Sequence, residues 1–178
     1  MRPALWLLLP LLAAGCGGDD GERLSQSDLP RAPAALRVSS PAFIDGSRLP
    51  QRYTCDGAGD EPRVQAGTVP ASTRELMLVV SDPDAPGGTY VHLTRYGISA
   101  RGDGSVDHGG REGDNSAGDI GWAPPCPPEG DGRHRYVWSV YARRDPSGLK
   151  EGAPPDEVAA ALREGVLAKG TISARYGR

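Results

Sequence analysis

Side chains capable of acid–base or hydrogen-bonding chemistry occur at three separate places in the chain. The stretch "SDPDAPGG" carries Asp82 and Asp84, "YVHLT" carries His92, and "HRYVW" carries His134 and Tyr136. Imidazole and phenol groups can donate hydrogen bonds, while a carboxylate can orient a histidine or accept from a ligand. If the three segments meet in the fold, we expect one cluster that either binds an anionic oxygen group or serves acid–base catalysis.

Each segment also has an interpretation that involves no ligand. Asp-Pro-Asp is typical of a stiff turn, in which the carboxylates accept hydrogen bonds from nearby backbone N–H groups. A single histidine within a strand is typical of a core residue whose hydrogen bonds are satisfied inside the protein. Taken one at a time, the residues leave the turn, the core and the site open.

The apolar pattern predicts the elements that would position these side chains. "RELMLVVS" is a continuous apolar run of strand length, whereas "TYVHLTRYGIS" and "HRYVWSVYA" alternate as half-buried strands do. The predicted strands are 36–39, 74–81, 89–99, 134–142 and 171–176. A helix is predicted after Pro154 and Pro155, with Asp156 as its cap and Gly170 at its end. These elements indicate a mainly-β domain with two packed sheets.

Strand alternation also predicts which side chains share a face. In the strand 89–99, one face is expected to carry Tyr90, His92, Thr94 and Tyr96. In the strand 134–142, one face is expected to carry His134, Tyr136, Trp138 and Val140. The segment 100–133 is rich in glycine and proline, and a loop of this length inside a compact domain is usually functional or disordered.

Composition limits the classes of function. The chain has 178 residues, which suggests one domain, and a formal net charge of −3, which argues against nucleic acid as a partner. Its three histidines lie far apart in the sequence without metal-ligand spacing, and the motifs G-x-S-x-G and H-E-x-x-H do not occur. We therefore expect no metal and no cofactor.

The N-terminus has the layout of a bacterial export signal. A single positive charge at Arg2 precedes an apolar stretch, and "LAAGC" resembles a lipobox. We expect a signal peptide over 1–15, a lipidated Cys16, a flexible tether over 16–35 and a folded domain over 36–178. This predicts a protein of the cell envelope, outside the cytoplasm and anchored through Cys16. An ordinary signal peptide is the alternative.

Longer motifs resemble one protein family. "SPAFIDGSRLPQRYTCDG", "DPDAPGGTYVHLTRYGI", "GWAPPCPPEGDGRHRYVWSVYA" and "LAKGTISARYGR" are similar in order and spacing to the phosphatidylethanolamine-binding protein family. They most resemble its bacterial branch, the Raf kinase inhibitor-like proteins. One departure is at Ala123 and Pro124, where the family has two glycines; the proline stiffens this loop.

The resemblance implies an antiparallel β-sandwich with peripheral helices and a shallow pocket for phosphate or phosphate esters. The residues it implies for ligand binding are Asp82, Asp84, His92, Pro125, His134 and Tyr136. It also implies a binding protein rather than an enzyme, with a protease or a kinase as the partner that it would inhibit.

Two cysteines remain besides Cys16. Cys55 and Cys126 lie in segments that resemble family motifs, and outside the cytoplasm an even pair favours a disulfide. We expect a Cys55–Cys126 bridge between the "YTCDG" turn and the "APPCPP" loop. Two separate buried thiols are the alternative.

Three functions are compatible with the sequence. The first is a lipid-anchored binding protein with an anion pocket. The second is a hydrolase that uses the aspartates and histidines of the cluster. The third is a structural lipoprotein of the envelope. Stabilisation by phosphate separates the first from the third, whereas turnover of a phosphoester would favour the second.

Overall fold

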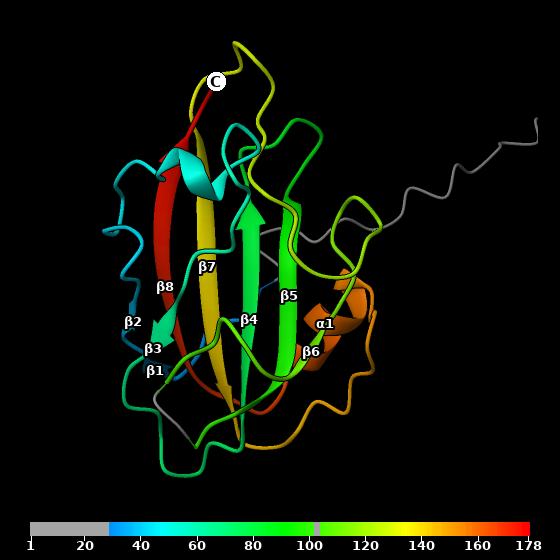
Figure 1. Cartoon of the computed structure of the whole chain (residues 1–178). Coiled ribbons are helices and arrows are strands. Elements are labelled where there is room, and N and C mark those ends of the chain that lie inside the picture. Colours follow the sequence, from blue (N-terminus) through cyan, green and yellow to red (C-terminus); the bar gives the residue numbers. More distant parts are fainter. Residues whose placement is uncertain (1–28, 102–103) are drawn as a thin grey trace, which may run out of the picture.

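The computed structural model describes residues 29–101 and 104–178 (Figure 1). The predicted signal peptide and Cys16 lie outside the described residues. The strands are β1 Ala34–Ala35, β2 Val38–Ser39, β3 Gln65–Ala66, β4 Glu75–Asp82, β5 Tyr90–Ser99, β6 Arg111–Glu112, β7 His134–Arg143 and β8 Val166–Tyr176. The helices are a short 3-10 turn, η2 Gln51–Tyr53, and the α-helix α1 Pro155–Leu162.

Two sheets make up the fold. The large sheet has the strand order β1-β8-β7-β4-β5-β6, and its neighbouring strands are antiparallel except for β1, which runs parallel to β8. The small sheet pairs β2 with β3. In Figure 1 the small sheet lies in front of the large one, whereas α1 lies behind β5. The mainly-β class predicted from the sequence is confirmed.

The central strand β4 supplies side chains to a core on each face of the large sheet. All of its residues are buried. Leu76, Leu78 and Val80 belong to the core that includes Val64 and Ala66 of the small-sheet side. We call this side the small-sheet face. Met77 and Val79 belong to the other core, which includes Val158 and Leu162 of α1, and we call that side the helix face. Burial on both faces explains why the strand reads as a continuous apolar run.

The fold begins earlier than the boundary predicted at residue 36. Leu29 is buried in the core of the helix face, and Ala34 and Ala35 pair with Ala168 and Lys169 of β8. The last part of the predicted tether over 16–35 is therefore packed against the sheet. The predicted strand at 36–39 is shorter than expected, because only Val38–Ser39 forms β2.

The predicted helix is wrong at both ends. It begins at Pro155 with Pro154 as its N-cap, so Asp156 lies in the first turn instead of capping the helix. It ends at Leu162, and Gly165 turns the chain with a positive φ of 74° that favours glycine. The residues up to Gly170 belong to β8, which pairs with β7. Tertiary pairing overrides the helical propensity of this segment.

Among the described residues, the structure contains no helix long and apolar enough to span a bilayer.

Candidate functional site

A pocket of about 350 Å³ opens at the end of the large sheet where β4 ends and where β5 and β7 begin. Its walls are formed by Asp82, Ala85, Pro86, Tyr90, His92, Pro124, Cys126, Pro127, Pro128, His134 and Tyr136. The pocket therefore brings together four residues singled out in the sequence, namely Asp82, His92, His134 and Tyr136. They come from three neighbouring strands, β4, β5 and β7.

A β-bulge places His92 in this pocket. Val80 of β4 pairs with Leu93, but the next residue, Ser81, pairs with Val91, so His92 is an extra residue in β5. Its ring packs 4.7 Å from the ring of Tyr90, measured between centroids. A bulge reverses the alternation of side chains along the strand beyond it.

The predicted common face of Tyr90, His92, Thr94 and Tyr96 is consequently wrong. The ring of His92 also contacts Tyr136, which belongs to the small-sheet face. Tyr96 is buried in the core of the helix face instead. In β7, which has no bulge over this stretch, Tyr136, Trp138 and Val140 do share one face as predicted.

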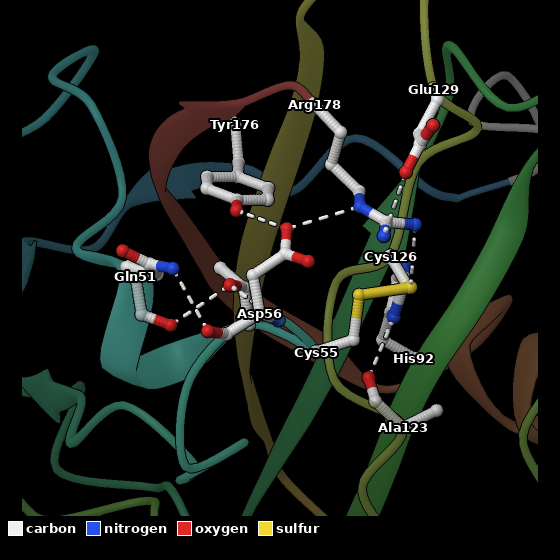
Figure 2. The surroundings of a disulfide bond; sticks show 10 residues. Gln51, Cys55, Asp56, His92, Ala123, Cys126, Glu129, Tyr176 and Arg178 are labelled. Atoms are coloured by element: carbon white, nitrogen blue, oxygen red, sulfur yellow. Dashed lines mark hydrogen bonds and ion pairs between the residues drawn. A yellow bond between two sulfur atoms is a disulfide. The ribbon is translucent and has the colours of Figure 1, made fainter.

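His92 is held as a neutral ring. Its Nδ1 donates a hydrogen bond of 2.7 Å to the carbonyl oxygen of Ala123, which can only accept (Figure 2). The side chain is buried, and burial lowers its pKa more than this hydrogen bond and the nearby Asp82 raise it. With the proton on Nδ1, Nε2 is left as an acceptor. His92 can therefore accept a hydrogen bond from a ligand hydroxyl or N–H group.

His134 faces two carboxylates. Its Nδ1 donates to Oδ2 of Asp82 at 2.7 Å, and its Nε2 lies 3.3 Å from Oδ2 of Asp131. Burial by itself lowers the pKa of this imidazole, but the two carboxylates outweigh it and the pKa is raised. The pKa values of the two histidines therefore shift in opposite directions, because only His134 hydrogen-bonds to carboxylates.

The carboxylates of the "DPDAP" turn are occupied by contacts within the protein. Oδ1 of Asp82 accepts from the backbone N–H of Asp84 at 2.9 Å, while its Oδ2 accepts from His134. Oδ2 of Asp84 accepts from the backbone N–H of Arg135 at 2.8 Å. Asp84 is exposed and is not among the residues that line the pocket. Asp82 thus orients a histidine and also makes the turn contact that the sequence left open, whereas Asp84 bonds to the backbone of β7.

Tyr136 contributes a buried donor. Its side chain is fully buried, and its hydroxyl has no hydrogen-bond partner among the described residues. Burial, with a smaller contribution from the charge of Asp82, raises the pKa of this hydroxyl above its ordinary value. The group therefore stays protonated and able to donate. An unpaired buried hydroxyl in a pocket wall is a position where a ligand acceptor would replace a missing hydrogen bond.

The proline-rich loop closes the pocket on one side. Pro124, Cys126, Pro127 and Pro128 line the pocket, whereas the predicted ligand residue Pro125 does not. Pro125 is buried, and its carbonyl oxygen accepts from the N–H of Cys55 at 3.1 Å. Its role in this structure is to join two loops.

A disulfide fixes this loop to the turn after η2. Cys55 and Cys126 are bonded, with their Cα atoms 5.3 Å apart (Figure 2). The sequence alone left two separate thiols as the alternative.

The C-terminal residue also holds the loop, which the sequence did not indicate. The guanidinium of Arg178 lies 3.1 Å from Oδ2 of Asp56, 3.4 Å from Oε1 of Glu129 and 3.7 Å from Sγ of Cys126 (Figure 2). The sequence likewise gave no indication of Asp131, the second partner of His134. Both residues act through loop geometry, for which a sequence pattern gives no signal.

The pocket combines polar groups with an apolar rim. Tyr136 supplies an O–H group without a partner among the described residues, His134 supplies a ring that faces Asp82 and Asp131, and the prolines supply a stiff apolar rim. In the described part of the chain, no group of three or more His, Cys, Asp or Glu residues could hold a metal ion.

Sequence comparison places the chain among known relatives. Residues 39–177 match the model of the family described as phosphatidylethanolamine-binding protein. A Mycobacterium tuberculosis protein named "Putative lipoprotein LppC" is 37% identical over 174 residues, which covers 89% of this chain and 86% of that protein. A UPF0098 protein of Aquifex aeolicus is 34% identical over 154 residues, which covers 82% and 90% of the two chains.

Solved structures show the same fold. CT736 of Chlamydia trachomatis, described as a phosphatidylethanolamine-binding protein homologue, superposes with a TM-score of 0.75 at 30% identity, covering 81% of this chain and 98% of its own. YbcL of Escherichia coli, described as a member of the mammalian family, superposes with a TM-score of 0.74 at 25% identity, covering 82% and 99%. The fold and the motif order therefore lead to the same group of proteins.

Proposed function

The chain belongs to the phosphatidylethanolamine-binding protein family, and from this premise we propose that it is a binding protein whose pocket holds a phosphate or phosphate-ester anion. The residues that would contact the ligand are His92, His134 and Tyr136, with Asp82 orienting His134. The bonded carboxylates explain how an anion pocket tolerates the "DPDAP" turn, since both oxygens of Asp82 and one oxygen of Asp84 accept hydrogen bonds from the protein itself.

One observation carries the proposal. A histidine with a raised pKa and a buried tyrosine hydroxyl without a partner line the same pocket of about 350 Å³. The imidazolium gives a charge-assisted contact, and the hydroxyl gains the hydrogen bond that it lacks. Together they favour a ligand that is negatively charged and rich in acceptor oxygens.

The test is calorimetric titration of the full chain with inorganic phosphate and with phosphoethanolamine at pH 6.5. We expect His134→Gln to weaken binding about 10-fold or more, the range of a lost charge-assisted hydrogen bond. His108→Gln is the matched control, because the His108 side chain is exposed and lies outside the pocket. A wild-type protein that binds neither probe, or equal affinities in the two variants, would count against the proposal.

Binding is favoured over hydrolysis by the contacts of His134. A histidine oriented by a carboxylate is also the arrangement of a general base, and this keeps the hydrolase as the second candidate. Here, however, Asp82 and Asp131 raise the pKa of His134, which disfavours the free base that general-base catalysis needs, and an anion would take the place of the exposed Asp131 carboxylate at Nε2. Turnover of a phosphoester panel that is lost in His134→Gln would favour the hydrolase. Absence of any stabilisation by phosphate would favour a structural role.

The membrane anchor belongs to the same proposal. The export signal and the "LAAGC" motif support lipidation of Cys16, and the name of the Mycobacterium tuberculosis relative is compatible with an envelope lipoprotein. We expect metabolic labelling with palmitate to mark the wild-type chain, and Cys16→Ser to lose the label and move to the aqueous phase of a detergent partition. A labelled Cys16→Ser chain would contradict it. Inhibition of a protease or a kinase stays a prediction of the family resemblance.

A further inference from the structure

A second cavity, of about 190 Å³, shares no lining residue with the pocket. It is lined by Gly46, Arg48, Arg133, Arg175, Tyr176 and Gly177. It lies at the C-terminal end of β8, where the segment before Leu49 runs beside that strand (Figure 1). Half of its lining residues are arginines, and none is acidic.

Backbone pairing fixes two of the arginines side by side. Arg48 and Arg175 form a parallel β-bridge, in which the N–H of Leu49 donates to the carbonyl of Arg175 and the N–H of Arg175 donates to the carbonyl of Ser47, both at 2.8 Å. Their positions are therefore set by main-chain hydrogen bonds and do not depend on side-chain contacts.

The third arginine enters from the loop before β7. His134 pairs with Tyr176, so Arg133 comes next to the end of β8. The chain there is closely packed, because a Cβ added to Gly177 would overlap the carbonyl oxygen of Gly132. Gly46, on another wall, would meet no atom with an added Cβ, which leaves that side of the cavity open.

The charges at this place are not neutralised by the described part of the protein. Arg48, Arg133 and Arg175 form no salt bridge with a carboxylate of residues 29–101 or 104–178. Arg175 also pairs across the sheet with Arg135 of β7, so it has an arginine on each neighbouring segment. Like charges opposite each other destabilise a sheet.

Acidic side chains on the neighbouring segments have other partners. Asp45 accepts from the N–H and the hydroxyl of Ser173, Asp131 faces His134, and Asp56 accepts from the hydroxyl of Tyr176 and faces Arg178. Arg48, Arg133 and Arg175 are exposed, whereas the buried Arg95 is paired with Glu61 and Glu112. The cavity is therefore a place where an outside anion would relieve the repulsion among the arginines.

We propose that the cavity lined by Arg48, Arg133 and Arg175 is a second anion site, which binds a phosphate group. Guanidinium groups match phosphate oxygens with paired hydrogen bonds. The small volume fits one phosphate group, whether free or at the exposed end of a lipid headgroup, and not a whole lipid. The site does not depend on the anion pocket, and either one can exist without the other.

The two sites differ in their response to pH, which allows a clean experiment. Guanidinium groups stay charged at any pH that the protein tolerates, whereas the imidazolium of His134 is lost as the pH rises through its pKa. Calorimetric titration of the full chain carrying His134→Gln, which cannot form the imidazolium, at pH 9 and low ionic strength therefore reports the arginine cavity, and wild type is compared with it. The probes are inorganic phosphate and glycerophosphoglycerol, a soluble phosphodiester headgroup.

We expect wild type and His134→Gln to bind equally at pH 9, and the double variant Arg48→Gln/Arg175→Gln to bind about 10-fold or more weakly, as expected for lost charge-assisted contacts. The matched control is Arg144→Gln/Arg163→Gln, which removes the same charge from two exposed arginines outside the cavity. Arg133 lies outside the strands, so Arg133→Gln should weaken phosphate binding without altering the strand pairing.

The probes identify the source of the phosphate. Binding of inorganic phosphate supports the site with a free anion as ligand, and binding of glycerophosphoglycerol alone supports it with a headgroup as ligand. Three results overturn the proposal: no heat with either probe, equal losses in the two double variants, or loss of binding in His134→Gln at pH 9. The last would place the bound phosphate in the pocket instead.

Discussion

At the scale of single residues, a substitution at Tyr136 should weaken ligand binding without lowering the stability of the fold. Its buried hydroxyl has no partner, so Tyr136→Phe should leave the free energy of unfolding unchanged or raise it by about 1 kcal/mol. The same substitution should weaken phosphate binding about fivefold, the value of one neutral hydrogen bond. Urea denaturation and calorimetry measure the two effects.

The control for Tyr136 is Tyr141→Phe. Tyr141 is equally buried in the same strand but belongs to the core of the helix face, away from the pocket. Removal of the Tyr141 hydroxyl should not change the affinity for phosphate. A Tyr136→Phe variant that is clearly less stable than wild type would mean that the hydroxyl has a partner, and the pocket would then lack its free donor.

The raised pKa of His134 predicts a pH dependence of stability. Because the folded state favours the imidazolium, its contribution is fully present below the unfolded pKa of about 6.5 and is lost as the pH rises through the folded pKa. The groups that face it are Asp82 and Asp131, with His92 opposing the charge. We expect the urea midpoint of the wild type to fall as the pH rises above 6.5.

His134→Gln should remove this alkaline decline, since glutamine does not titrate. Asp82→Asn is the second variant, because it keeps His134 but removes the carboxylate that raises its pKa most directly. It should move the decline to lower pH. Identical pH profiles in wild type and His134→Gln would show that another group causes the decline.

At the scale of elements, the sequence predicted the strands that are either buried on both faces or alternate strictly between apolar and polar residues. The predicted strands 74–81 and 134–142 agree with β4 and β7 to within one residue, because burial on both faces and strict alternation are local patterns. The directions of His92 and Tyr96 in β5 were wrong, since a bulge depends on the partner strand. The residues before Gly170 were read as helix because their neighbours are alanines and leucines, which favour a helix when no sheet is present.

Gly170 tests this assignment. In β8 an added Cβ would overlap the carbonyl oxygen of Leu36 and press on the side chain of Val38, so Gly170→Ala should push the N-terminal segment away from the sheet. We expect a loss of about 2 kcal/mol in the free energy of unfolding, within the range for overpacking. In a helix the same substitution would be stabilising.

Thr171→Ala is the matched control for Gly170→Ala. Thr171 is the next residue of β8 and is exposed, so its loss should change the free energy of unfolding by less than about 0.5 kcal/mol. Urea denaturation of both variants makes the comparison. A stabilised Gly170→Ala variant would contradict the packing of the N-terminal segment over β8.

At the scale of the whole molecule, the candidate site could be predicted as far as neighbouring strands determine it. Asp82, His134 and Tyr136 lie at strand ends or within strands, so the strand pattern could single them out, although it left their convergence open. The roles of Asp84 and Pro125 depend on how loops fold back, and no periodic pattern encodes that. The cluster of Arg48 with Arg175 also escaped prediction, because it requires knowing which distant segments run side by side.

The Cys55–Cys126 disulfide links the two halves of the molecule across 71 positions of sequence. In the chain-entropy model, a closed loop of this length stabilises the fold by about 4 kcal/mol, a large part of the roughly 5–15 kcal/mol that holds a domain together. Cys55→Ser/Cys126→Ser should therefore lower the free energy of unfolding by about 4 kcal/mol in urea denaturation.

Reduction provides an internal control for the disulfide. A thiol reductant should destabilise the wild type to the level of the double variant and leave the double variant itself unchanged. Phosphate binding should weaken in both, because Cys126 lines the pocket and the loop would then be held only by hydrogen bonds and ion pairs, such as those of Pro125 with Cys55, Ala123 with His92, and Trp122 with Gly59. If the double variant unfolded within about 1 kcal/mol of the wild type, those contacts alone would fix the loop, and the bridge would add little to either the fold or the pocket.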